Sequence, residues 1–236
     1  DGDGLGDNKD AFPNDSNLQY LDIEVAIDGL VGTNFKQCVR EQTNGISNAG
    51  EVTRLDCNHR NIQSVSGVGN FPNLEELYLS HKAFCDISPI ATLTELKKLD
   101  LDWGSQCVTD IEPLRGLRKL EWLDLDGQRV ATLAPLANHP RLRELNIGHN
   151  DLSTLDELGT MGALNYLHAH RNRLVNPSLS NFPNLRGVNL DGNNLSALEE
   201  VAKSLSETVE WLSLNDASIN DLSSLNGRIA IRRIYA

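Results

Sequence analysis

Apolar residues recur along this chain at a fixed long interval that neither a single helix nor a single strand produces. The motif reads L-x-x-L-x-L, and its second apolar position returns after 22, 22, 24, 22, 22, 21, 24 and 22 residues. A helix has an apolar period near 3.6 residues and a strand a period of 2, so this interval indicates a repeated supersecondary unit. The positions are Leu55, Leu77, Leu99, Leu123, Leu145, Leu167, Val188, Leu212 and Ile234.

An interval of this length is typical of leucine-rich repeats, in which each unit lays down one short strand and crosses back. We therefore expect residues 52–236 to form an α/β repeat, a right-handed leucine-rich-repeat solenoid with short parallel strands. Its back should be irregular or 3₁₀, because proline suits a tight turn better than a strand at Pro89, Pro113 and Pro135. Residues 198–206 have helical spacing and should form a true helix.

The segment before the first repeat is predicted to be a helical cap. Residues 18–51 lack the repeat, and the first unit would expose an apolar edge if nothing covered it. A helix over residues 33–42 is predicted by apolar residues at i, i+3 and i+4, which are Phe35, Cys38 and Val39. Its N-cap is expected at Thr33-Asn34.

The four cysteines allow three pairings, and the repeat register ranks them. Cys57 lies at an inward position of the first unit, where the capping helix must pack, so Cys38 is its expected partner. Cys85 and Cys107 are one repeat apart, and stacked strands about 4.8 Å apart suit the Cα separation of a disulfide. The alternative is that all four are free thiols, with Cys57 replacing a leucine. Disulfides would favour an oxidising place outside the cytosol.

The opening residues, DGDGLGDNKDAFPND, carry oxygen ligands at short intervals with glycines between them. They fit the frame of an EF-hand-type calcium loop whose first ligand would fall before residue 1. Residues 1–17 resemble a partial thrombospondin type 3 calcium-binding repeat, including its Phe-Pro-Asn-Asp ending. The alternative is a flexible acidic linker. The resemblance implies a structural Ca²⁺ ion with an incomplete set of ligands, which are Asp1, Asp3, Leu5, Asp7 and Asp10.

The repeats themselves resemble the internalin type of bacterial leucine-rich repeat over residues 52–236, through backs such as Asp-Ile-Ser-Pro-Ile at residues 86–90. That family places Asn after the strand, where its side chain bonds the backbone of the turn. Asn150, Asn172 and Asn193 fit, whereas other units have Arg60, Lys82, Gly104, Gln128 and Ala217. The resemblance implies a secreted or cell-surface bacterial protein that binds a protein partner.

Charge and motifs narrow the classes of function. The formal net charge is −12 over 236 residues, which disfavours nucleic acid, whose phosphates need clustered Lys and Arg. No apolar run approaches the roughly 18 residues of a membrane-spanning helix, so no membrane insertion is expected. We expect no enzyme activity, because no catalytic motif occurs. His168 and His170, with Asp191 on the next unit, are the nearest thing to a metal site, although such residues are more often polar surface.

The expected working surface is the concave strand face, where side chains between the paired leucines point away from the core. Carboxylates on neighbouring units would repel one another, which favours a partner with a basic patch, and exposed aromatic residues anchor interfaces. The alternative is that Asp between two leucines is an ordinary solvent-facing choice. We predict a binding module that recognises a protein, with calcium and disulfides in structural roles. A glycan-binding module, or an accessory domain of a larger secreted enzyme, is the alternative. The predicted partner-binding residues are Tyr78, Asp100, Asp102, Trp103, Trp122, Asp124, Asp126, Asn146, His149, Tyr166, His168 and His170.

Overall fold

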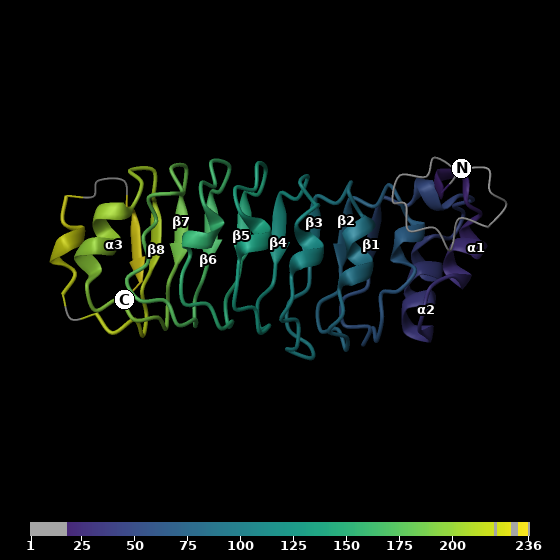
Figure 1. Ribbon diagram of the computed structural model, residues 1–236, viewed down its shortest axis with the longest axis horizontal. Helices are drawn as coiled ribbons and strands as arrows, with labels where there is room; N and C mark the ends of the chain where they lie inside the picture. Colours follow the sequence, from purple (N-terminus) through teal and green to yellow (C-terminus); the bar gives the residue numbers. More distant parts are fainter. Residues whose placement is uncertain (1–17, 220, 228–230, 236) are drawn as a thin grey trace. The chain divides into compact units, whose positions relative to one another are not determined.

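The structure is a computed structural model that describes residues 18–219, 221–227 and 231–235 (Figure 1). The chain divides into two compact units, residues 1–120 and residues 121–236. In both units, short parallel strands follow one another in chain order, and the segments between them run over the back of each repeat. This is the leucine-rich-repeat fold that the apolar interval predicts.

The first unit begins with helices and continues with strands. Its α-helices are α1 (Ile23–Asp28) and α2 (Thr33–Gln42), and its strands are β1 (Arg54–Asp56), β2 (Glu76–Tyr78) and β3 (Lys98–Asp100). The connecting 3₁₀ turns are η2 (Leu18–Tyr20), η3 (Ala49–Glu51), η4 (Val68–Asn70), η5 (Ser88–Thr92) and η6 (Glu112–Leu114).

The second unit is built of strands with 3₁₀ turns and a helix on their back. Its strands are β4 (Trp122–Asp124), β5 (Glu144–Asn146), β6 (Tyr166–His168), β7 (Gly187–Asn189), β8 (Trp211–Ser213) and β9 (Arg233–Tyr235). The remaining elements are η7 (Ala134–Leu136), η8 (Asp156–Leu158), α3 (Leu198–Ser204) and η9 (Ser223–Leu225).

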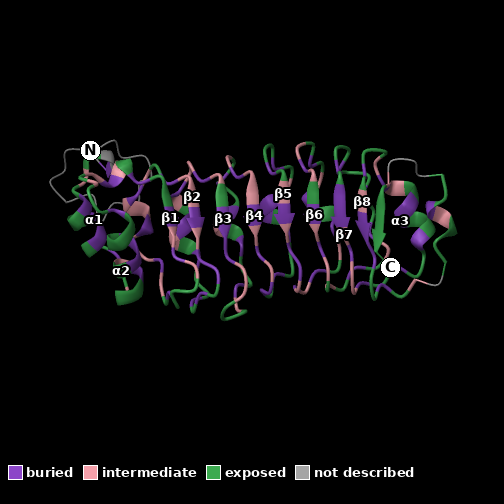
Figure 2. Ribbon diagram, turned by 180° about the vertical axis from the view of Figure 1, so that it is seen from behind, coloured by how far each residue is buried: buried purple, intermediate pink, exposed green. Residues whose placement is uncertain are grey.

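The repeated apolar position sets the strand register in each unit. Leu55, Leu77 and Leu99 are paired across β1, β2 and β3. In the second unit the same position pairs through Leu123, Leu145, Leu167, Val188, Leu212 and Ile234. The side chains from Leu55 to Leu212 at this position are fully buried, whereas flanking strand residues are more exposed (Figure 2). Each repeat therefore buries one stripe of apolar side chains against its neighbours.

The backs of the repeats follow the proline pattern. Pro89, Pro113 and Pro135 lie in the first positions of η5, η6 and η7. Amide protons at the start of a helical turn have no acceptor within that turn, so proline, which lacks this proton, costs no hydrogen bond there. The predicted helix over residues 198–206 is present as α3 and ends two residues earlier, at Ser204. No helix in the described part of the chain is long and apolar enough to cross a membrane.

The cap contains the predicted helix with its predicted bounds, and Phe35, Cys38 and Val39 are its buried residues. The predicted N-cap at Thr33-Asn34 is wrong, because the helix is capped at Gly32 without a side-chain hydrogen bond. The amide of Asn34 instead donates to carbonyl oxygens of residues 60 and 61, in the turn after β1. A capping rule considers only residues next to the end of the helix, so it does not predict this contact with residues distant in the sequence.

All four cysteines are paired as the register predicts. Cys38 and Cys57 form a disulfide with a Cα–Cα distance of 5.8 Å, which ties α2 to the residue after β1. Cys85 and Cys107 form the other, with a Cα–Cα distance of 5.2 Å, and join successive turns of the solenoid. The alternative of four free thiols is excluded in this structure.

Asparagines after the strands bond the turn backbone, as the resemblance implies. The Asn150 amide donates to the carbonyl oxygens of Leu125 and Gly148, at 2.9 and 2.8 Å. Asn172 and Asn193 make the same kind of contacts in the next repeats. These buried amides satisfy carbonyl groups that the tight turns would otherwise leave unpaired.

Lys82 takes the place of this asparagine in the first unit. Its side chain is only 2% exposed, and its ammonium donates to the carbonyl oxygens of Leu101 and Trp103, at 2.6 and 3.3 Å. Gln128 takes the place of the asparagine in the second unit. Its side-chain amide donates to the carbonyl oxygen of Asp126 at 3.3 Å. At these two positions a longer side chain thus takes over the role of the asparagine.

Candidate functional site

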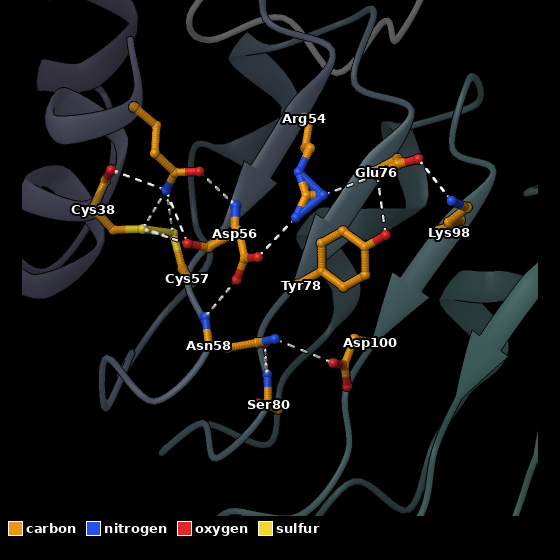
Figure 3. Close-up of polar contacts among 11 residues, drawn as sticks. Cys38, Arg54, Asp56, Cys57, Asn58, Glu76, Tyr78, Ser80, Lys98 and Asp100 are labelled. Atoms are coloured by element: carbon orange, nitrogen blue, oxygen red, sulfur yellow. Dashed lines mark hydrogen bonds and ion pairs between the residues drawn. A yellow bond between two sulfur atoms is a disulfide. The ribbon is translucent and has the colours of Figure 1, made fainter. Parts of the chain in front are cut away.

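On the strand face of the first unit, the first residues of neighbouring strands form a row of alternating charge (Figure 3). Arg54 pairs with Glu76 at 3.1 Å, and Glu76 pairs with Lys98 at 2.9 Å. The hydrogen bond from Lys98 holds the pKa of Glu76 below its ordinary value. Arg54 also pairs with Asp56 at 2.8 Å, so the two cations of this row are matched by two carboxylates.

Tyr78 is held by the same row (Figure 3). Its hydroxyl donates to Glu76 at 3.0 Å, and the Arg54 guanidinium carbon lies 4.6 Å from the ring centre. Burial, and then the hydrogen bond to Glu76, raise the pKa of the Tyr78 phenol. This predicted partner-binding residue therefore presents a fixed, half-buried aromatic ring.

The aspartates between the paired leucines have a local structural role. At the third position of a strand, a side-chain oxygen accepts a hydrogen bond from the backbone amide two residues later. Asp124 accepts from the amide of Asp126 at 2.8 Å, and Asn146 accepts from that of Gly148 at 3.1 Å. The same bond occurs at Asp56, Asp100 and Asn189. The recurrence of Asp and Asn here thus has a cause in the turn itself.

Asp100 corrects the expectation that this row of carboxylates faces solvent. Its residue exposure is 9%, and its carboxyl accepts from the Asn58 amide at 3.5 Å (Figure 3). It also accepts from the Asp102 backbone amide at 3.0 Å. Burial raises the pKa of Asp100 to about 6, against an ordinary value of 3.8. Little of this side chain is accessible to a large partner.

Aromatic side chains gather on the strand face of the second unit. The rings of Tyr166 and Trp211 approach each other over Gly187, the first residue of β7. A Cβ atom at Gly187 would lie 2.8 Å from Trp211 and 2.9 Å from Tyr166, so a larger residue would displace these rings. Tyr235 extends the group, with its ring centre 6.5 Å from that of Trp211. Tyr166 is 43% exposed and Tyr235 46%, so apolar ring surface faces solvent here.

His168 lies beside this aromatic group, with its ring centre 5.7 Å from that of Trp211. Burial lowers the pKa of His168 below 6.5, so the ring is mostly neutral near pH 7. Next to it, the Asn146 amide donates to Asp124 at 2.9 Å. Asn146 and His168 are register partners on β5 and β6, so the polar pair lies next to the aromatic group on the strand face.

A second group on this unit brings together Asp126, His149 and His170, which follow β4, β5 and β6. The Asp126 carboxylate lies 2.8 Å from Nδ1 of His149 and 3.8 Å from Nε2 of His170. The imidazole rings of the two histidines meet edge to face, with centres 4.8 Å apart. Burial is the main cause that lowers the pKa of His170, and Asp126 opposes it.

The structure revises the expected metal-binding trio. The prediction grouped His168 and His170 with Asp191, but Asp191 accepts hydrogen bonds from Ser213 and from the amide of residue 215. Within the described residues, the group of three whose ligand atoms lie close enough for one ion is Asp126, His149 and His170. The sequence pattern paired neighbours along one strand, whereas the turns bring together residues from successive repeats.

The structure places the predicted partner-binding residues in two groups, one in each unit. Tyr78, Asp100, Asp102 and Trp103 belong to the first unit, and the others belong to the second. The predicted set of partner-binding residues lacks Trp211 and Tyr235, which lie beside its members Tyr166 and His168 in the structure. The available signal was Gly187, where several other repeats have a bulky residue at the same strand position.

His149 and Trp103 occupy a position at which the backbone is left-handed, with φ of 48° and 44°. The same conformation occurs at His59, His81 and Arg171. Residues other than glycine adopt it rarely, so the repeat turn holds these side chains in a defined direction. The predicted calcium ligands Asp1, Asp3, Leu5, Asp7 and Asp10 lie outside the described residues.

Comparison with known proteins agrees with the fold. No protein-family model matches the chain. The 187-kDa microtubule-associated protein AIR9 of Arabidopsis thaliana is 32% identical over 109 residues, which are 45% of this chain and 6% of that protein. The chain therefore spans only a small part of that relative.

Solved structures give broader coverage at lower identity. Internalin C2 of Listeria monocytogenes superposes with a TM-score of 0.79 at 20% identity, over 92% of this chain and 96% of that chain. Internalin F of the same organism gives 0.58 at 19% identity, over 93% and 76%. The functional domain of InlJ, also from Listeria monocytogenes, includes a cysteine ladder and gives 0.60 at 16%, over 91% and 56%. The chain therefore has the leucine-rich-repeat fold found in the internalins.

Proposed function

We propose that this chain is a binding module that docks a protein partner on the strand face of its second unit. The observation that carries the proposal is the aromatic group of Tyr166, Trp211 and Tyr235 around Gly187. Large aromatic side chains contribute much of the binding energy of protein interfaces, because they bury a large area at a small loss of side-chain freedom.

The arrangement is preorganised for contact. The rings of Tyr166 and Trp211 both lie over Gly187, which has no side chain to separate them. Trp211 also contacts the rings of His168 and Tyr235. Ring surface that is already fixed loses little conformational entropy on binding, so more of the contact energy appears as affinity. A half-exposed Tyr166 provides the central anchor of this surface.

Charge favours a basic partner. The chain carries 33 acidic and 21 basic residues, and the partly exposed Asp124 lies on the same strand face. Because the turn amide already occupies one oxygen of Asp124, we assign the carboxylates to steering and the rings to affinity. This changes the weighting that the sequence suggested, since the buried Asp100 contributes little contact surface.

Two disulfides and the internalin-like fold support a secreted or cell-surface setting, because such bonds persist in oxidising compartments. The acidic segment at residues 1–17 supports a structural Ca²⁺ ion held by Asp3, Asp7 and Asp10, with Asp1 and the Leu5 carbonyl contributing. Calorimetric titration of Ca²⁺ into the chain and into an Asp3→Asn, Asp7→Asn variant tests this. Equal heats would identify the segment as a linker.

The partner proposal is tested with the immobilised chain against purified extracellular proteins and, in parallel, a glycan array. A double variant, Tyr166→Ala with Trp211→Ala, should weaken binding of the protein found by tenfold or more, because hot-spot truncations cost about 2 kcal/mol or more. The matched control is Glu199→Gln with Glu200→Gln on α3, which should bind like the original chain.

Thermal melting of both double variants must show that the fold is retained. If the aromatic double variant melts normally and binds with unchanged affinity, the working surface is not this group. If the array yields a glycan whose binding depends on Tyr166 and Trp211, the surface is a glycan site and the protein-partner proposal fails.

A further inference from the structure

The strongest unassigned chemistry in the molecule is the group formed by Asp126, His149 and His170. Each of these residues follows a strand of the second unit, one repeat after the other. In each, one ligand atom lies within 4.8 Å of those of the other two. Carboxylate and imidazole together are a donor set that suits Zn²⁺ and related first-row ions.

The distances bracket those of a bound ion. Bonds of about 2.0–2.1 Å to a tetrahedral zinc ion place neighbouring ligand atoms roughly 3.3 Å apart. Oδ1 of Asp126 lies 2.8 Å from Nδ1 of His149, and Oδ2 lies 3.8 Å from Nε2 of His170, so the potential ligand atoms already lie near the spacing of a coordination shell. The short contact is a hydrogen bond whose proton a metal ion would replace.

The environment of His170 independently supports a metal-binding site. Its Nδ1 is buried without a hydrogen-bond partner in the described part of the structure. Buried polar atoms are nearly always paired, so the unpaired Nδ1 marks a ring that lacks one polar partner, while its Nε2 faces the Asp126 carboxylate. No hydrogen bond at Nδ1 therefore has to break when the ring coordinates an ion.

Gly148 makes room for this ring. A Cβ atom at that residue would lie 2.1 Å from Cε1 of His170 and 2.5 Å from its Nε2. The imidazole therefore rests directly on the backbone of the neighbouring repeat, where only glycine leaves space. The strand pattern has a polar side chain at the matching position in most other repeats, such as Asp126 and Asp191.

We propose that Asp126, His149 and His170 bind a transition-metal ion of the zinc class, with a fourth position open to water or to a ligand from outside the chain. The side chains of these residues are 13%, 30% and 18% exposed, so the site is partly shielded but reachable from the strand face. Three protein ligands with an open position are the arrangement of reactive rather than closed structural zinc sites.

Coordination by two histidines makes Zn²⁺ binding depend on pH, because the metal ion competes with protons for the ring nitrogens. A neutral imidazole is the form that coordinates a metal. Binding should therefore weaken as the pH falls through the histidine range and the rings take up protons.

The test is titration of Zn²⁺ into the metal-free full chain with excess Ca²⁺ present, so that the acidic segment at residues 1–17 does not compete. Calorimetry should show one saturable equivalent, and Co²⁺ should produce the visible absorption of a four-coordinate ion. His170→Gln and Asp126→Asn should each weaken Zn²⁺ binding tenfold or more. Gly148→Ala should weaken it too, because the ring is displaced.

Matched controls use histidines outside the group. His168→Gln removes a histidine from the same strand as His170, and the stacked pair His59 and His81 has ring centres 4.3 Å apart in the first unit. Neither His168→Gln nor His59→Gln should change the stoichiometry or lower the affinity more than twofold. His149→Asn tests the third ligand, since Asn tolerates the left-handed backbone at this position.

Several results would overturn the site. One is the absence of saturable Zn²⁺ binding in the original chain, and another is undiminished binding in folded His170→Gln and Asp126→Asn. Equal losses in His168→Gln and His170→Gln would show scattered surface binding instead. Because these readouts need no protein partner, the metal site and the proposed partner surface can fail independently.

Discussion

The side-chain amide of Gln42 forms two hydrogen bonds with the backbone of Asp56, one in each direction. Its nitrogen donates to the Asp56 carbonyl at 2.9 Å, and its oxygen accepts from the Asp56 amide at 2.8 Å. The end of α2 thus imitates a neighbouring strand along β1. An open strand edge is a site for unwanted pairing, and the cap covers it with a side chain as well as with a disulfide.

Gln42→Ala should lower the free energy of unfolding by about 1–3 kcal/mol, because it leaves an amide and a carbonyl of β1 without these partners. Urea denaturation measures the change. Gln37→Ala is the matched control on the same helix, since the Gln37 amide donates to the exposed Glu41 side chain at 2.9 Å. Equal effects of the two substitutions would show that helix propensity, not edge pairing, is responsible.

Loss of the Cys85–Cys107 bond should destabilise the first unit. The closed loop spans a sequence separation of 22 residues, and chain entropy predicts about 3 kcal/mol for a loop of this length. A Cys85→Ser, Cys107→Ser variant should therefore unfold at a lower urea concentration than the oxidised chain. Reduction of the original chain also breaks Cys38–Cys57, so it should lower the midpoint further than the variant does. If the variant unfolds at the same urea concentration as the oxidised original chain, the Cys85–Cys107 bond does not stabilise this unit.

Asp100 should make stability depend on pH. Its folded pKa of about 6 exceeds the ordinary 3.8, so its stabilising contribution is complete below about pH 3.8 and is lost as the pH rises through 6. Asp100→Asn should raise the free energy of unfolding at pH 7 by at most about 3 kcal/mol and flatten this dependence. Urea denaturation across this pH range provides the measurement.

Asp86 is the control for that experiment, because its pKa is shifted in the opposite direction to that of Asp100. The hydrogen bonds from Ser88 hold the pKa of Asp86 below its ordinary value, so its contribution is present above that value and is lost in acid. Asp86→Asn should therefore lower stability at pH 7. If both substitutions move stability in the same direction, the burial of Asp100 does not govern its titration.

Lys82 should be far more important to stability than an exposed lysine. Lys82→Met keeps most of the buried stem but removes the ammonium that bonds two carbonyls, which should cost about 1–3 kcal/mol. Lys97→Met removes a surface ion pair with Glu75 and should change stability by less than about 1 kcal/mol. Thermal and urea unfolding of the two variants, measured together, decide the comparison.

Much of the architecture follows from local information. The apolar interval places Leu55, Leu77 and Leu99 in register, and the same register brings Cys85 beside Cys107. The apolar spacing predicts the buried side of α2, formed by Phe35, Cys38 and Val39. These predictions succeed because each repeat contacts its neighbours at fixed offsets, so positions in the sequence translate directly into positions along the solenoid.

The chemistry of the surface depends on the tertiary structure. The alternation of a strand predicts that Asp100 points outward, but only the packing around it shows that its carboxyl is covered. The turns after successive strands bring His149 and His170 next to the carboxylate of Asp126, and the sequence pattern does not show this. Repeat spacing determines the repeat and the strand position that a residue occupies. Its burial and its ligand geometry depend on side-chain directions and on neighbours about 22 residues away in the sequence.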